Sequence, residues 1–168
     1  MFQLFKNKEQ KEITLGAPVK GRAVAISEVS DPTFGEEILG KGVALIPQDG
    51  YIYAPADGKI ELLFDTLHAV SMTTTDGIEI LVHIGLETVE LKGQHFTAHK
   101  ATGDTVKKGD LLITVDLDAL KEAGYDVITP MVVCNTADFK EVTAVVGQDV
   151  NPGDDVLLVE KNERKSLF

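Results

Sequence analysis

Residues 77–89 read G-I-E-I-L-V-H-I-G-L-E-T-V, a strongly apolar stretch with one histidine, His83, near its centre. Because side chains alternate between the two faces of a β-strand, the stretch predicts a strand with one unbroken apolar face. The members of that face are Ile78, Ile80, Val82, Ile84 and Leu86. His83 belongs to the opposite face, between Leu81 and Gly85. An imidazole with open space on one side and an apolar neighbour on the other indicates a docking site.

A second histidine is expected beside the first. His68 precedes His83 by fifteen residues, and residues 73–77, T-T-T-D-G, have the composition of a turn between antiparallel strands. Such a hairpin places the two rings side by side. The register argument is weaker for His68, because it is in phase with the apolar residues Val70 and Met72 unless its strand begins after it.

Short runs of Val, Ile and Leu, separated by turns rich in Gly, Asp and Pro, predict an all-β domain over residues 12–160. Its ends, residues 1–11 and 161–168, are polar and charged and are expected to be mobile. Two short connecting helices are expected, at residues 31–39 after an Asp-Pro pair and at residues 116–123.

Two segments of the chain recur. Ala17-Pro18-Val19-Lys20-Gly21 is echoed by Ala54-Pro55-Ala56-Asp57-Gly58, and G-D-T-V-K-K-G-D at 103–110 by G-Q-D-V-N-P-G-D at 147–154. The echoes indicate two interleaved halves, too irregular in period for a solenoid. A single antiparallel β-sandwich or flattened barrel, jelly-roll-like and internally duplicated, is the expected architecture.

Charge and composition exclude several classes of function. The net charge is −11, so a nucleic-acid partner would be repelled. The single cysteine, Cys134, follows an apolar run and is expected in the core, which fits a reducing compartment. No segment approaches the roughly 20 apolar residues of a membrane helix, so a cytoplasmic protein is expected.

The other two histidines, His95 and His99, are spaced so that they could bind a metal only on a helix. They lie in a Gly- and Thr-containing segment that does not favour a helix, and a surface position is expected for both.

Two neighbouring imidazoles permit three chemistries. They could bind zinc, although no third ligand is obvious from spacing, and they could act as an acid–base pair at neutral pH. Alternatively, one ring takes a phosphoryl group on nitrogen while the other donates a hydrogen bond to the phosphoryl oxygens. That reaction needs mainly alignment and charge stabilisation from the protein. The sequence has no phosphate-binding loop of the G-x-x-x-x-G-K-S type, which disfavours a nucleotide as the donor.

Residues 77–89 resemble the phosphohistidine signature of the glucose-class IIA component of the bacterial phosphoenolpyruvate-dependent sugar phosphotransferase system. Each of the thirteen positions fits the pattern of glycine, two spacers, three aliphatics, histidine, aliphatic, glycine, aliphatic, spacer, threonine and small aliphatic. The likeness extends through residues 54–58, 65–69 and 90–93 and covers roughly residues 12–160.

The resemblance implies that His83 is the phosphoryl acceptor and that His68, backed by the Thr66 hydroxyl, supports the transferring group. It implies two protein partners, the phosphocarrier HPr as donor and the cysteine of a IIB sugar-transporter domain as acceptor, and no cofactor. Both partners would use one face, which by this likeness includes Asp31, Phe34, Ile38, Phe64, Leu81, Glu87 and Val89.

Two other classes of function remain open at this point. The Ala-Pro-x-x-Gly segments are similar to those of biotinyl and lipoyl carrier domains, but such domains present a lysine on a tight turn, and Met131 has no lysine next to it. A zinc-dependent hydrolase is the other alternative, which the zinc content of the purified protein would test.

Overall fold

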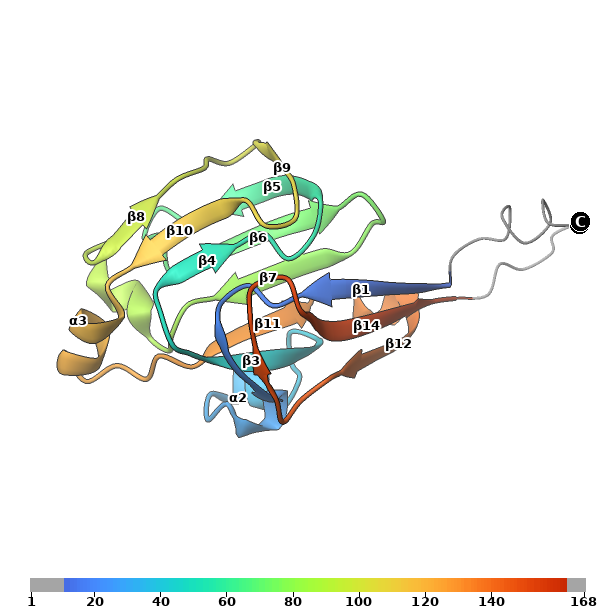
Figure 1. Cartoon of the computed structure of the whole chain (residues 1–168), viewed down its shortest axis with the longest axis horizontal. Coiled ribbons are helices and arrows are strands. Elements are labelled where there is room, and N and C mark those ends of the chain that lie inside the picture. Colours follow the sequence, from blue (N-terminus) through green and yellow to red (C-terminus); the bar gives the residue numbers. More distant parts are fainter. Residues whose placement is uncertain (1–10, 163–168) are drawn as a thin grey trace, which may run out of the picture.

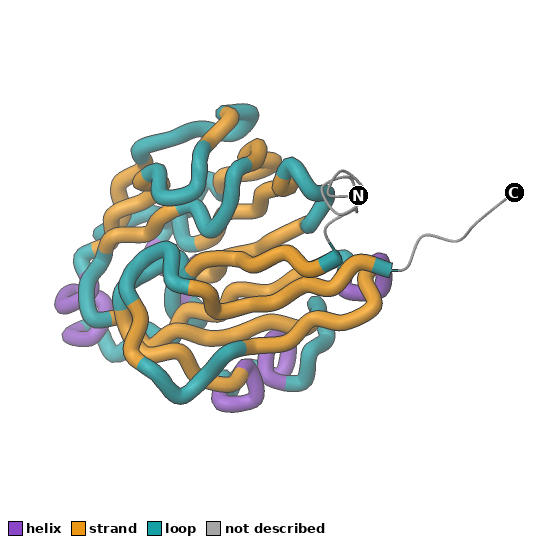
Figure 2. Tube along the Cα trace, turned by 45° about the vertical axis from the view of Figure 1, so that its right-hand side comes forward, coloured by secondary structure: helices purple, strands orange, loops and turns teal. Residues whose placement is uncertain are grey.

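The structure is a computed structural model that describes residues 11–162 of the 168-residue chain. Strands dominate it, and the short helical segments lie at the periphery (Figure 2). The helical segments are η1 (Ile26–Glu28), α2 (Pro32–Gly35), η2 (Thr88–Leu91), α3 (Leu117–Glu122) and η3 (Thr136–Asp138). The strands are β1 (Glu12–Gly16), β2 (Gly21–Ala25), β3 (Lys41–Pro47), β4 (Tyr51–Tyr53), β5 (Gly58–Leu63), β6 (Ala69–Thr74), β7 (Glu79–His83), β8 (Phe96–Ala98), β9 (Thr105–Val106), β10 (Leu111–Val115), β11 (Thr129–Val133), β12 (Phe139–Ala144), β13 (Asp149–Val150) and β14 (Asp155–Lys161).

The strands form three sheets, ordered β13-β2-β3-β11-β7-β6-β5-β9, β4-β10-β8 and β1-β14-β12, and their pairings are antiparallel. The sheet β4-β10-β8 lies over the β5-β6-β7 part of the large sheet, and β1-β14-β12 lies beside β3 (Figure 1). The all-β antiparallel class is therefore confirmed. The large sheet ends at β13 and β9, so over residues 11–162 the sheets stay open and do not close into a barrel.

The two echoes in the sequence occupy equivalent places in the structure. The strand order of the large sheet is symmetric about the β11–β7 pair, so that β2, β3 and β13 match β5, β6 and β9. The Ala-Pro corners exchange hydrogen bonds reciprocally, from Gly16 N–H to Pro55 O (2.9 Å) and from Tyr53 N–H to Pro18 O (2.7 Å). The expected internal duplication is thus a pseudo-two-fold arrangement of two halves.

The main core lies between the sheets, and a smaller one lies on the other face of the large sheet. Ile80 and Val82 in β7, with Ile78 just before it and Ile84 just after it, are almost completely buried in the main core, as the alternation predicts. Leu86, expected on the same face, packs instead in the smaller core, because β7 ends at His83 and the alternation ends with it. The smaller core forms where η1 and α2 cover the opposite face, around Val24, Ile26, Val29, Phe34, Ala44, Leu86, Ile128 and Val132. This smaller core lies beneath His83, whose ring contacts Phe34.

Two expectations about local structure need correction. The helix expected at residues 31–39 ends at Gly35, because Glu37 adopts a left-handed backbone conformation (φ 59°) that stops a helix. Cys134 is exposed, just after the end of β11 at Val133. At the other end of the domain, β14 extends to Lys161, whose N–H donates to Lys11 O (2.7 Å).

The helix expected at residues 116–123 is present as α3, with the Asp116 carboxylate accepting from Ala119 N–H at its start. Most of the two expected mobile ends, residues 1–10 and 163–168, lies outside the described residues. Within residues 11–162 no helix is long and apolar enough to cross a membrane.

Candidate functional site

The β6–β7 hairpin brings His68 and His83 together. His83, the last residue of β7, pairs with Ala69, the first residue of β6, so His68 lies just before its strand, where its side chain is only 6% exposed. The Ile84 N–H donates to His68 O at 2.7 Å. As a result the ring centroids are 4.9 Å apart, with the rings edge to face at 82°.

One ring nitrogen of His83 is fixed by the backbone. Nδ1 lies 2.7 Å from Gly85 O, which can only accept, so Nδ1 carries the proton of the neutral ring. This leaves the lone pair on Nε2. Gly85 has φ +76°, which favours glycine, and this conformation directs its carbonyl back to the ring.

His68 has a side-chain partner. Its Nδ1 lies 2.6 Å from the Thr66 hydroxyl. With Thr66 as the donor, the proton of the His68 ring is on Nε2, which then serves as a hydrogen-bond donor. The pair therefore combines one nitrogen with a free lone pair and one N–H donor.

The pKa of both imidazoles is lowered, which favours the neutral rings at pH 7. Burial and, to a smaller extent, the neighbouring His83 lower the pKa of His68 to about 4. Burial also lowers the pKa of His83, opposed by the hydrogen bond to Gly85 and by the Asp31 carboxylate. A neutral His83 is the form that can act as a nucleophile.

Two phenylalanines border the rings. The Phe34 ring lies 5.0 Å from that of His83, and the Phe64 ring lies 5.5 Å from that of His68, edge to face. Phe34 is only 3% exposed and belongs to the smaller core, so its main contacts are inside the protein rather than on a docking face.

The remaining residues expected on the docking face differ in exposure. Ile38 and Val89 are 68% and 48% exposed, which is unusual for such side chains. Leu81, for which the strand pattern offered no core to fill, instead packs half-buried against the smaller core. Asp31 is partly buried and Glu87 is exposed, and both line a cavity of about 330 Å³ with Ser30, Pro32 and Leu86.

Sequence reasoning missed two contributors to the site. One is the Gly85 carbonyl, because a pattern of side chains does not show where a backbone carbonyl points. The other is Thr88, which is fully buried and donates its hydroxyl proton to Ile84 O at 2.6 Å.

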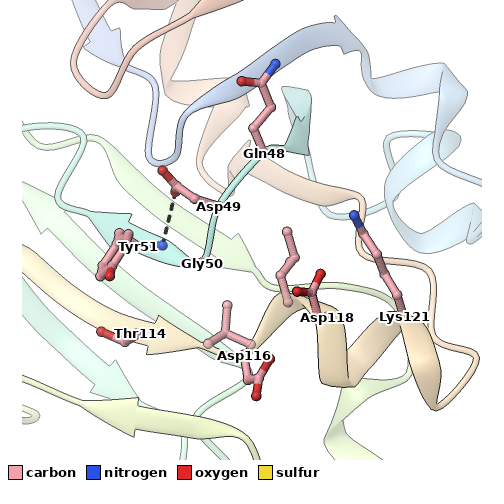
Figure 3. A pocket seen from close by; sticks show the side chains of 10 residues that line it. Gln48, Asp49, Gly50, Tyr51, Thr114, Asp116, Asp118 and Lys121 are labelled. Atoms are coloured by element: carbon pink, nitrogen blue, oxygen red, sulfur yellow. Dashed lines mark hydrogen bonds between the residues drawn. The ribbon is translucent and has the colours of Figure 1, made fainter.

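The other two histidines and a second cavity lie apart from this pair. His99 is exposed and bonds the Thr114 hydroxyl (2.6 Å), and His95 lies in the loop before β8. The cavity in Figure 3, about 330 Å³, is lined by acidic residues that stabilise local structure: Asp49 accepts from Tyr51 N–H, and Asp116 caps α3. No group of three or more His, Cys, Asp or Glu side chains is placed to hold a metal ion among residues 11–162.

The comparisons agree on one family. The model of the phosphoenolpyruvate-dependent sugar phosphotransferase system, EIIA 1, matches residues 13–139, a range that includes both histidines. The chain is 40% identical over 153 residues to the PTS system glucose-specific EIIA component of Oceanobacillus iheyensis, covering 91% of this chain and 93% of that protein. The glucose permease IIA from Mycoplasma capricolum has a similar structure, with a TM-score of 0.81, 33% identity and coverage of 89% of this chain and 96% of that one.

Some relatives are much longer. The match to the PTS system beta-glucoside-specific EIIBCA component of Bacillus subtilis is 48% identical over 123 residues but spans only 20% of that protein. The chain belongs to the EIIA 1 family of the sugar phosphotransferase system, and it is a phosphotransferase component. The alternative of a biotinyl or lipoyl carrier is not supported, and Met131 lies buried in β11 rather than on a turn.

Proposed function

We propose that this chain is a phosphohistidine relay of the glucose class, which accepts a phosphoryl group from phospho-HPr on Nε2 of His83. It then passes the group to the cysteine of a IIB sugar-transporter domain. The observation that carries the proposal is the hydrogen bond from His83 Nδ1–H to Gly85 O, because it leaves the lone pair of a neutral imidazole on Nε2.

Each transfer exchanges one bond to phosphorus for another. In the first step the Nε2–P bond forms on His83 as the N–P bond of the donor phosphohistidine breaks, and the lone pair returns to the donor ring. In the second step the thiolate of the acceptor cysteine forms an S–P bond as the Nε2–P bond breaks, and the electron pair of the broken bond returns to Nε2. His83 Nδ1–H, bonded to Gly85 O, stabilises the positive charge that the ring acquires in the phosphorylated state.

His68 is the supporting residue in this proposal. Its ring lies 4.9 Å from that of His83, near enough for an Nε2–H to reach a phosphoryl oxygen on His83. When the Thr66 hydroxyl, 2.6 Å away, donates to Nδ1, the His68 proton stays on Nε2. Burial and the neighbouring His83 lower the pKa of His68 to about 4. At neutral pH the ring is therefore uncharged and acts as a neutral hydrogen-bond donor.

The partners dock, in this proposal, on the apolar surface around the two rings. Ile38 and Val89 are its most exposed apolar members, Phe64 lies beside His68, and Asp31 and Glu87 form an acidic edge. An exposed apolar patch with a charged rim is typical of a protein interface. One face serves both partners, since each must bring its own reactive atom to the same Nε2.

The test is to phosphorylate the chain with phosphoenolpyruvate, enzyme I and HPr and to map the modified peptide under alkaline conditions. We expect one label, on the peptide with His83, that is lost in acid and stable in alkali. His83→Ala should take up no label and stay folded. A label on the His68 peptide, a label that survives acid, or no label at all contradicts the proposal.

A further inference from the structure

The loop that follows β7 has an unusual backbone. Gly85 and Glu87 both have positive φ angles, +76° and +60°. Because Glu87 carries a side chain, such a conformation needs support from its surroundings. The hydrogen bond from His83 depends on this loop, since its acceptor is the Gly85 carbonyl.

Two consecutive peptide groups of the loop are held from outside. The Gly85 C=O and the Leu86 N–H belong to one planar group and point in opposite directions. The Leu86 N–H donates to Asp126 O at 2.9 Å, which fixes the direction of the Gly85 carbonyl. The preceding group is held through Ile84 O, which accepts from the Thr88 hydroxyl at 2.6 Å.

The side chain of Thr88 also limits how the loop can move. A Cβ built on Gly85 would lie 2.8 Å from Thr88 Cγ2 and 3.0 Å from Asp126 O, so Thr88 and Asp126 leave no room for a side chain at this position. Thr88 is fully buried, and without its hydroxyl the Ile84 carbonyl loses this partner in a water-free place. Ile84 in turn connects the two histidines, through its N–H bond to His68 O.

From this geometry we infer that Thr88 is a positioning residue for His83: its hydroxyl fixes the Ile84–Gly85 backbone, so that the Gly85 carbonyl keeps the ring proton on Nδ1 and the lone pair on Nε2. Thr88 touches no reacting atom and acts only through the loop. The part of this inference that concerns phosphoryl transfer rests on the proposed function, whereas the part that concerns the tautomer does not.

The test compares matched variants of the full chain. Thr88→Val keeps the shape and removes the hydroxyl, and Thr88→Ser keeps the hydroxyl and removes the methyl. Thr136→Val is the control, because Thr136 donates a similar 2.6 Å bond to a strand carbonyl, Val133 O, away from the histidines. The Thr136 hydroxyl also accepts from Lys41 N–H at 3.0 Å, so this control removes at least as many hydrogen bonds as Thr88→Val. The readouts are the ring ¹⁵N chemical shifts of His83, which report the tautomer, and the rate of phosphorylation by phospho-HPr.

For Thr88→Val we expect the ring shifts of His83 to move towards those of a mixture of tautomers. Phosphorylation should be roughly tenfold slower, less than the ~10²-fold that an ångström of misplacement can cost. Thr88→Ser and Thr136→Val should both resemble the unmodified chain. If Thr88→Val does not fold, Thr88→Ala replaces it, because the smaller side chain cannot clash with its neighbours. The same change in ring shifts and in phosphorylation rate is expected for Thr88→Ala.

Unchanged ring shifts in a folded hydroxyl-free variant overturn the inference. So does an equal change in Thr136→Val, because the effect would then be a general loss of stability. If the unmodified chain is not phosphorylated but Thr88→Val still shifts the tautomer, the proposed function fails and the positioning role stands.

Discussion

The Phe34 ring lies 5.0 Å from the His83 ring, although one comes from a four-residue helix and the other from the end of a strand. This contact joins the reactive face to the smaller core, because Phe34 is buried there. The position of the His83 ring, the proposed nucleophile, thus depends on packing beneath it as well as on its hydrogen bond to Gly85 O.

Phe34→Ala should therefore destabilise the fold by about 3 kcal/mol, the usual cost of removing a buried aromatic ring. Urea unfolding measures the change. Phe34→Leu, which fills more of the space, should lose less than half as much. Equal stabilities for Phe34→Ala and the unmodified chain would show that Phe34 is not part of a packed core.

Ile38→Asp should weaken docking of HPr without weakening the fold. The side chain is 68% exposed, so the free energy of unfolding should change by less than about 0.5 kcal/mol. An NMR titration with HPr gives the affinity. Leu81→Asp is a poorer probe, because Leu81 packs against the smaller core. Its loss would change the stability of the fold as well as the affinity for HPr. Unchanged affinity in Ile38→Asp would place Ile38 outside the interface.

His68→Gln should still take up phosphate on His83 but pass it on more slowly. Glutamine keeps an N–H donor but lacks the ring geometry set by Thr66. We expect a slowing of roughly tenfold, smaller than the ~10²-fold cost of removing a charge-stabilising donor outright. Rapid-quench transfer to a IIB domain measures this step. Label failing to appear on His83 in this variant would instead make His68 essential for acceptance.

Acid should weaken the fold through His68. Its pKa is lowered from 6.5 to about 4 in the folded chain, so between these values the unfolded chain binds more protons. The stability from this group is present above pH 6.5, falls as the pH drops through that window and changes little below pH 4. His68→Gln removes the titration, so its stability should fall less over the same range in urea unfolding at several pH values. If the free energy of unfolding fell equally with pH in the two proteins, the lowered pKa of His68 would be contradicted.

Gly85→Ala should cost about 3 kcal/mol, because it combines a left-handed backbone conformation with a contact of 2.8 Å to Thr88 Cγ2. Gly124→Ala is the matched control: its φ is similar, +91°, but nothing lies within 4 Å of the added Cβ, so it should cost about 1 kcal/mol. Adding Thr88→Ser to Gly85→Ala should recover part of the difference, and a strictly additive double variant would argue against the contact.

The strand alternation predicted the central hairpin well. The apolar face of β7 and the Thr-rich turn needed only local pattern, and the side-by-side histidines followed from them. The exact placement of His68 did not, because it depends on β6 beginning at Ala69, and strand ends are set by tertiary pairing.

The second core could not be read from the sequence for a different reason. Period-two alternation assigns Leu81 to the outer face, but it does not show that η1 and α2 fold back over that face and bury Phe34. Thr88 was missed similarly, since its role comes from one hydrogen bond to Ile84 O in a non-repeating loop. Nothing local distinguishes such a threonine from one facing solvent.

The pseudo-two-fold arrangement of the fold sets the stoichiometry of the proposed relay. By symmetry β11 and β3 are the counterparts of β7 and β6, and neither of the two contains a histidine. The duplicated scaffold therefore presents the His68–His83 pair once. A fully phosphorylated chain should carry one phosphoryl group. Intact-mass measurement under alkaline conditions should show a single addition of phosphate at saturation, and the other half of the scaffold then serves only as structural support.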